Sequence, residues 1–96
     1  MQLKQLLKGL KEMDKLLGAA IQKDLGYNEF THFMINQSIT EMAVKEVIDN
    51  LDNWTAIRHT DTSLLIGPGC SYTKPEPLGV SLIVGAWNYP LFTIVP

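Results

Sequence analysis

The chain has 96 residues, which suits one small domain, and its formal net charge is −2 at neutral pH. Apolar residues make up 46% of it, which excludes a disordered chain, and the scattered charges form no basic stripe for nucleic acid. Its apolar runs fall far short of the roughly 20 residues that a membrane-spanning helix needs. The single cysteine, Cys70, cannot form an internal disulfide, so we expect a reducing, cytoplasmic location.

Two amphipathic helices are predicted before Ile57. Over about residues 2–25, apolar side chains recur at steps of three and four residues, which predicts one helix that Gly26 ends. Gly18 weakens this helix, because glycine in a helix interior costs about 1 kcal/mol relative to alanine. Asn28 is a favoured N-cap for the second helix, whose apolar stripe is expected to pack in the core. That stripe consists of Ile35, Ile39, Met42, Ala43, Val47, Leu51 and Trp54.

Strands are predicted after Ile57. Residues 62–66 and 70–74 flank a Gly-Pro-Gly sequence, which predicts a β-hairpin. A Lys-Pro-Glu-Pro linker follows, and residues 80–84 are nearly all apolar, as is typical of a buried parallel strand. One parallel strand leaves its own backbone groups unpaired, so we expect the chain to be an incomplete piece of a larger α/β fold.

This strand is expected to run into the turn that holds the candidate site. Gly85, Ala86 and Trp87 lead to Asn88, whose amide side chain stands beside Tyr89. Ligands of open α/β sheets bind outside the carboxyl ends of the strands, which makes Asn88 a candidate functional residue. The alternative is that Asn88 is a helix cap or turn residue, since asparagine is favoured in both positions. Likewise, Trp87 and Tyr89 also fit aromatic packing, and Gly85 also fits a tight turn.

The sequence resembles the class 3 branch of the aldehyde dehydrogenases, which includes the fatty aldehyde dehydrogenases. The resemblance rests on Pro-Leu-Gly-Val at 77–80, on Ile-Val-Gly-Ala-Trp-Asn-Tyr-Pro at 83–90, and on Ala-Ala-Ile-Gln-Lys-Asp-Leu-Gly at 19–26. It implies that residues 1–96 are part of an N-terminal cofactor-binding domain with a Rossmann-like fold. It also implies that the hairpin at 62–74 belongs to the oligomerisation region, and that the nucleophilic cysteine and the general-base glutamate lie downstream of Pro96.

The resemblance further implies a reaction, the oxidation of an aldehyde to a carboxylic acid with NAD or NADP. In that reaction Asn88 would donate a hydrogen bond to the oxyanion, together with a backbone N–H beside the nucleophile. Gly85, Ala86 and Trp87 would lie near the cofactor, and Tyr89 would border the substrate tunnel. The implied substrate is a fatty or aromatic aldehyde, and the implied assembly of the full-length parent is a homodimer. Some members of this branch also carry a C-terminal anchor to the endoplasmic reticulum membrane.

Other residues and other functions compete with this interpretation. Cys70 stands away from the Asn88 turn and has no activating neighbour, and neither His32 nor His59 belongs to a metal-ligand pattern, so we expect no metal and no role for Cys70 in catalysis. We expect the isolated chain to be inactive. One alternative is a non-catalytic chain that pairs with a full-length subunit through its hairpin or an exposed strand. Another is an independent α+β module.

Overall fold

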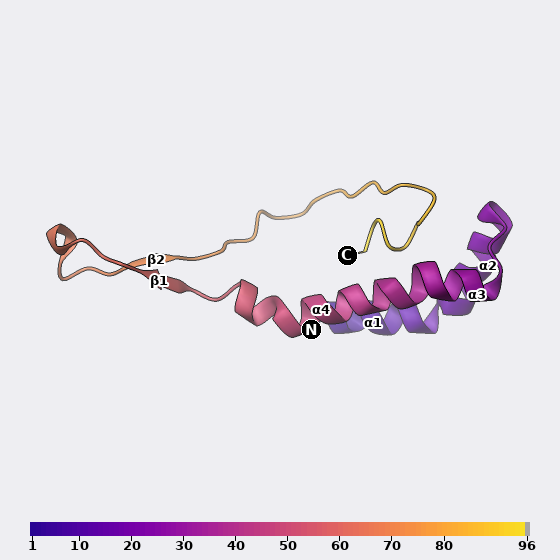
Figure 1. The fold of residues 1–96 in the computed structure, drawn as a ribbon, viewed down its shortest axis with the longest axis horizontal. Helices are drawn as coiled ribbons and strands as arrows, with labels where there is room; N and C mark the ends of the chain where they lie inside the picture. Colours follow the sequence, from indigo (N-terminus) through magenta and orange to yellow (C-terminus); the bar gives the residue numbers. More distant parts are fainter. Residues whose placement is uncertain (96) are drawn as a thin grey trace. The chain divides into compact units, whose positions relative to one another are not determined.

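The first predicted helix is two helices in the computed structural model, which describes residues 1–95 (Figure 1). They are α1 (Gln2–Glu12) and α2 (Asp14–Leu25). The break lies at Met13, where φ is −95° and ψ is 1°. The predicted stop is confirmed, because Gly26 adopts a left-handed conformation with φ 72° and its N–H donates to the Gln22 carbonyl at 2.9 Å.

The second predicted helix changes its geometry along its length. It begins as α3 (Glu29–His32), widens into the π-helical segment η1 (Phe33–Gln37), and continues as α4 (Ser38–Trp54). Its predicted N-cap is confirmed, because the Thr31 N–H donates to Asn28 Oδ1 at 2.8 Å. In a π-helix such as η1 each hydrogen bond spans five residues instead of four. Such segments are rare and occur mostly as single wide turns within α-helices.

Most of the buried side chains of this second helix are polar, although its apolar stripe predicted an apolar buried face. Leu10, Ile21 and Val44 are the buried apolar residues among residues 1–95. The buried polar residues are His32, Asn36, Gln37 and Thr40. Gln37 Nε2 donates to the Leu10 carbonyl at 3.3 Å and to Glu41 Oε1 at 2.8 Å, which joins η1 to α1. The predicted stripe is only partly covered, and its Met42 is 59% exposed.

The molecule divides into two units. One consists of Met1–Asp49 with the described part of Leu82–Pro96, and the other is Asn50–Ser81. The second unit contains the end of α4 and an antiparallel hairpin of β1 (Arg58–Thr60) and β2 (Ser71–Thr73), with His59 opposite Tyr72.

The hairpin prediction is therefore right in kind and wrong in its bounds. β2 lies inside the predicted second strand, but the predicted first strand, residues 62–66, is not a strand. Its apolar part is the 3₁₀-helix η2 (Leu64–Ile66), where the Leu65 N–H donates to Ser63 Oγ at 3.3 Å. A serine that accepts a nearby backbone N–H favours a turn over a strand ladder.

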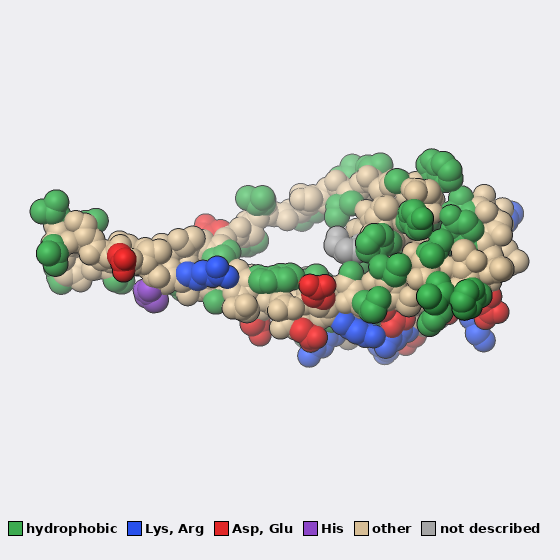
Figure 2. Space-filling view, viewed as in Figure 1, with side chains coloured by type: hydrophobic (Ala, Val, Ile, Leu, Met, Phe, Trp, Pro, Cys, Tyr) green, Lys and Arg blue, Asp and Glu red, His purple; other side chains and the backbone are tan. Residues whose placement is uncertain are grey.

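Residues 80–84 form no strand, which corrects the predicted buried strand. A strand needs a neighbour for its N–H and C=O groups, and no other segment of residues 1–95 pairs with these residues. Leu82 and Val84 are 92% and 86% exposed, and apolar side chains also protrude from the hairpin tip at η2 (Figure 2). Among residues 1–95, no helix is long and apolar enough to cross a membrane.

Candidate functional site

The candidate site is the turn that carries Asn88. Residues 87–94 follow the extended segment as a series of turns. Helix-like hydrogen bonds form in its second half: the Thr93 N–H donates to the Tyr89 carbonyl at 3.0 Å, and the Val95 N–H donates to the Leu91 carbonyl at 3.1 Å. Asn88 is half-buried, and its side-chain amide makes no hydrogen bond within residues 1–95.

Two side-chain hydroxyls contact the backbone of this turn. Thr93 Oγ1 lies 3.0 Å from the Ala86 carbonyl oxygen and 2.9 Å from the Tyr89 carbonyl oxygen, on either side of Asn88. The hydroxyl of Tyr27 donates to the carbonyl oxygen of Asn88 itself at 3.3 Å. Three of the four carbonyls from Ala86 to Tyr89 therefore have a hydroxyl partner.

Gly85 is required where the turn folds back on itself. A Cβ built on Gly85 would lie 2.5 Å from Ile94 Cγ1 and 2.7 Å from Thr93 Oγ1. Such distances are well inside van der Waals contact, so any larger residue would push the end of the turn away. The space beside Gly85 is filled by the side chains of Thr93 and Ile94.

The aromatic neighbours of Asn88 are exposed. Trp87 is 78% exposed and Tyr89 is 40% exposed. Trp87 also lines an apolar cavity of about 320 Å³ between the turn and α2. The other residues that line this cavity are Leu17, Ala20, Ile21, Asp24, Leu25, Pro90 and Leu91. The turn thus lies against the apolar stripe of α2, which holds Asn88 near the end of that helix.

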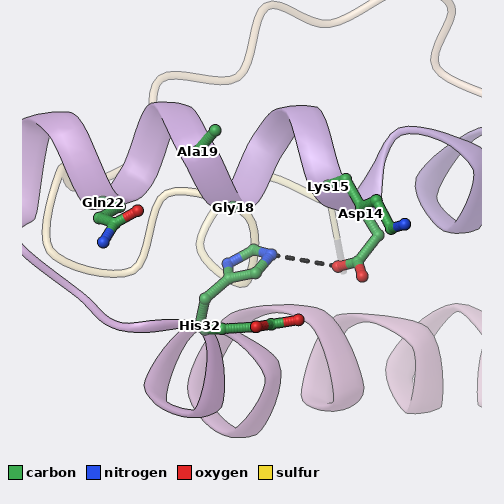
Figure 3. A pocket seen from close by; sticks show the side chains of 7 residues that line it. Asp14, Lys15, Gly18, Ala19, Gln22 and His32 are labelled. Atoms are coloured by element: carbon green, nitrogen blue, oxygen red, sulfur yellow. Dashed lines mark hydrogen bonds and ion pairs between the residues drawn. The ribbon is translucent and has the colours of Figure 1, made fainter.

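The buried histidine belongs to a different place, the contact between α2 and α3. His32 is 3% exposed, and its Nε2 lies 3.2 Å from Asp14 Oδ1 (Figure 3). Its ring fits under Gly18, because a Cβ on that glycine would lie 2.9 Å from His32 Cδ2. The cavity beside this pair has a volume of about 220 Å³. The glycine that the sequence marked as a weak point of the helix therefore makes room for a histidine.

The other candidates from the sequence belong to the second unit. Cys70 is exposed and lies in the second unit, as does His59, whose ring contacts Tyr72 edge to face at 6.1 Å. Within residues 1–95 no group of three or more metal-ligating side chains is placed to hold a metal ion.

Sequence reasoning missed Tyr27 and Thr93. Tyr27 stands between Gly26 and Asn28, two capping residues that fix its backbone. This position in the sequence is the one indication that its side chain has a fixed direction. Thr93 lies four residues after Tyr89, the spacing at which a hydroxyl reaches back to a carbonyl in a helical turn.

Comparison with known proteins places the chain among aldehyde dehydrogenases. It is 37% identical over 89 residues to 4,4'-diaponeurosporen-aldehyde dehydrogenase of Staphylococcus aureus, and 35% identical over 96 residues to aldehyde dehydrogenase family 3 member H1 of Arabidopsis thaliana. These matches cover 93% and 99% of this chain but only 19% and 20% of the relatives. No family profile matches the sequence.

A solved structure agrees with these relatives. The substrate-bound aldehyde dehydrogenase AldH of Staphylococcus aureus matches 98% of this chain with a TM-score of 0.89 and 35% sequence identity, and the match covers 20% of that chain. The chain therefore spans about a fifth of the length of the proteins it matches. Similar backbone and similar sequence over nearly every residue lead to one conclusion: the chain belongs to aldehyde dehydrogenase family 3 and corresponds to an N-terminal part of such an enzyme.

Proposed function

We propose that this chain supplies the oxyanion-stabilising amide, Asn88, of an enzyme that oxidises aldehydes to carboxylic acids with NAD or NADP. The observation that carries the proposal is the presentation of Asn88. Its carbonyl is bonded by Tyr27, while its side-chain amide makes no hydrogen bond within residues 1–95. A fixed backbone with a free donor is the arrangement that stabilises a developing negative charge.

Asn88 would act at the addition step. A cysteine thiolate attacks the aldehyde carbonyl, the C–S bond forms, and the carbonyl π electrons move to oxygen, which becomes negatively charged. The Asn88 Nδ2–H group would donate to that oxygen. An amide suits this role because it donates without titrating, and it adds no positive charge that would hold the electrons on oxygen when the carbonyl re-forms. The thiolate would come from elsewhere in the enzyme, because Cys70 has no activating neighbour in the sequence.

The predicted cofactor neighbours fit a nicotinamide cofactor only in part. Trp87 offers an exposed indole, and the side chain of Ala86 is only a methyl group, which leaves room for an approach. The open side of Gly85, however, is filled by Thr93 and Ile94, which favours the packing interpretation of that glycine. Residues 85–87 also carry no charge for a phosphate group. These three residues therefore do not form a dinucleotide site by themselves, and residues 86 and 87 would border one in the complete enzyme.

The substrate and the assembly are further parts of the proposal. The exposed ring of Tyr89 would border the substrate tunnel, which suits an apolar aldehyde of the fatty or aromatic class. The enzyme would be a homodimer, to which the β1–β2 hairpin would contribute within its oligomerisation region. The 96-residue chain by itself should reduce no NAD, because the nucleophile and the general base would be supplied from outside it.

The test is a substitution of Asn88 in an active enzyme. Residues 1–96 would replace the matched segment of the Staphylococcus aureus relative, and kcat would be measured with a medium-chain aldehyde. Asn88→Ala should lower kcat by about 10²–10³-fold, the usual effect of losing one oxyanion donor. The matched control is Asn53→Ala, which removes an exposed amide in the other unit and should leave kcat unchanged. An unchanged kcat in Asn88→Ala would contradict the proposed role.

One observation favours the non-catalytic alternative. Apolar side chains at 78, 80 and 82 are almost fully exposed, and their backbone pairs with no strand of residues 1–95. An unpaired extended segment of this kind can add to the edge of another sheet. Co-purification of the chain with a full-length family 3 subunit would support pairing. A chain that stays monomeric in the presence of that subunit would exclude it.

A further inference from the structure

We infer that Thr93 and Tyr27 are positioning residues, whose hydroxyls together hold the Asn88 turn in its catalytic geometry. The inference rests on the proposed function of Asn88 and adds two residues to which that function assigns no role. Both hydroxyls contact the backbone of residues 86–89, and neither contacts the Asn88 amide itself. They would therefore act through Asn88 and not on the substrate.

Thr93 fixes the two flanks of Asn88. Its Oγ1 is within hydrogen-bond distance of the Ala86 and Tyr89 carbonyl oxygens, at 3.0 Å and 2.9 Å. A hydroxyl has one hydrogen, so these two distances describe one hydrogen bond shared between two acceptors. The shared bond closes a loop in which Asn88 stands between the two anchored carbonyls. The close approach at Gly85 belongs to the same contact, because Thr93 Oγ1 occupies the space beside that residue.

Tyr27 fixes the middle of the turn. Its own backbone is held on both sides, because the Gly26 N–H donates to the Gln22 carbonyl at 2.9 Å and Asn28 caps α3. The phenol ring is half-buried and reaches the Asn88 carbonyl 61 residues along the chain. At 3.3 Å this bond is longer than a usual O–H···O bond, so we expect Tyr27 to contribute less than Thr93.

These bonds are suited to positioning more than to overall stability. The shared hydrogen bond of Thr93 lies at the surface, where water competes for the same groups. Loss of this bond should change the free energy of unfolding little but should loosen the direction of the Asn88 side chain. A misplacement of about 1 Å can cost about 10²-fold in rate, so a local effect of this kind is measurable in kcat.

The first test uses the 96-residue chain and needs no catalysis. NMR relaxation should give Asn88 a backbone order parameter of about 0.85, typical of a rigid residue, and Thr93→Val should lower it toward about 0.6. Thr55→Val is the matched control, because Thr55 Oγ1 donates at 2.8 Å to the carbonyl four residues before it and belongs to the second unit. A mobile Asn88 in the unsubstituted chain, or a rigid one in Thr93→Val, would overturn the inference.

The second test uses the chimeric enzyme described above. Thr93→Val should lower kcat about tenfold with KM within about twofold, whereas Thr93→Ser, which keeps the hydroxyl, should restore kcat. Tyr27→Phe should show a smaller loss, and its control Tyr72→Phe none. In an Asn88→Ala background, Thr93→Val should have no further effect, because a positioning residue has nothing left to position.

The two proposals fail in distinguishable ways. If Asn88→Ala leaves kcat unchanged, the proposed function itself is wrong. If Asn88→Ala lowers kcat but Thr93→Val does not, Asn88 is catalytic and the positioning inference is wrong. Equal losses from Thr93→Val in the presence and absence of the Asn88 amide would also overturn the inference, since Thr93 would then act independently of Asn88.

Discussion

Glycine residues of this chain differ in what their missing side chain allows. At Gly85 the turn that carries Asn88 folds back within contact distance of its own end, and at Gly18 a histidine ring occupies the space beside the helix. Gly9, in the middle of α1, has nothing within 4 Å of the position where a Cβ would stand. The helix propensity of glycine is the same at Gly9 and Gly18, so only their surroundings can make substitutions there differ.

Alanine should therefore have opposite effects at two helical glycines. Gly9→Ala should raise the free energy of unfolding by about 0.5–1 kcal/mol, because alanine has the higher helix propensity. Gly18→Ala should lower it by about 1–3 kcal/mol, because the new methyl group would push His32 away from Asp14. Urea unfolding of the two variants measures both values. A stabilising Gly18→Ala would show that the His32 contact is loose.

At the scale of elements, local signals predicted ends better than interiors. The Asn28 cap and the Gly26 stop are as expected, because each depends on one residue and its immediate backbone. The break at Met13 and the wide turn η1 were missed, since the stripe of apolar residues continues through both. The segment 62–66 was predicted as a strand from its apolar residues, whereas Ser63 accepts a backbone N–H and starts a 3₁₀-helix there.

The same contrast applies to the site. The turn at Asn88 was located from its sequence, because glycine and proline mark turns locally. The hydroxyl of Tyr27 was not assigned to it, because a contact across 61 residues depends on how α2 and the turn pack together. The strand at 80–84 was predicted from its apolar composition, but a ladder also needs a partner, and composition does not provide one.

The Asn28 cap should be measurable as a property of α3. Asn28→Ala removes the acceptor for the Thr31 N–H, and the free energy of unfolding should fall by about 0.5–2 kcal/mol. Asn28→Asp, which keeps an oxygen at the same position, should remain close to the unsubstituted chain. Thermal unfolding followed by circular dichroism distinguishes the two variants. Equal stability of Asn28→Ala and Asn28→Asp would mean that the cap does not hold α3.

At the scale of the whole molecule, the described chain exposes many large apolar side chains. Leu64, Leu78 and Val80 are each at least 99% exposed. Soluble monomeric proteins rarely expose apolar patches beyond a few hundred Å², and such surfaces usually bind another protein surface. This agrees with a chain that spans about a fifth of the length of its relatives, because longer chains have further segments to cover such residues.

The extended segment should therefore promote self-association of the 96-residue chain. Replacing Val80 and Leu82 with glutamate should lower the weight-average mass measured by sedimentation, since added negative charge disfavours the pairing of unpaired strands. The control replaces Leu16 and Leu64 with glutamate, which adds the same charge at exposed residues outside the segment. If both double variants lower the mass equally, net charge alone controls association.

The wide turn η1 also has a consequence for helical phase. The buried side chains His32, Asn36, Thr40 and Val44 follow one another at steps of four residues. An α-helix completes a turn in about 3.6 residues, so a four-residue series would rotate steadily away from the side that faces α1 and α2. A segment with five-residue hydrogen bonds holds more residues per turn and offsets part of this rotation. One face of a long helix can then stay directed at the same neighbours beyond the point where a regular α-helix would have turned it toward solvent.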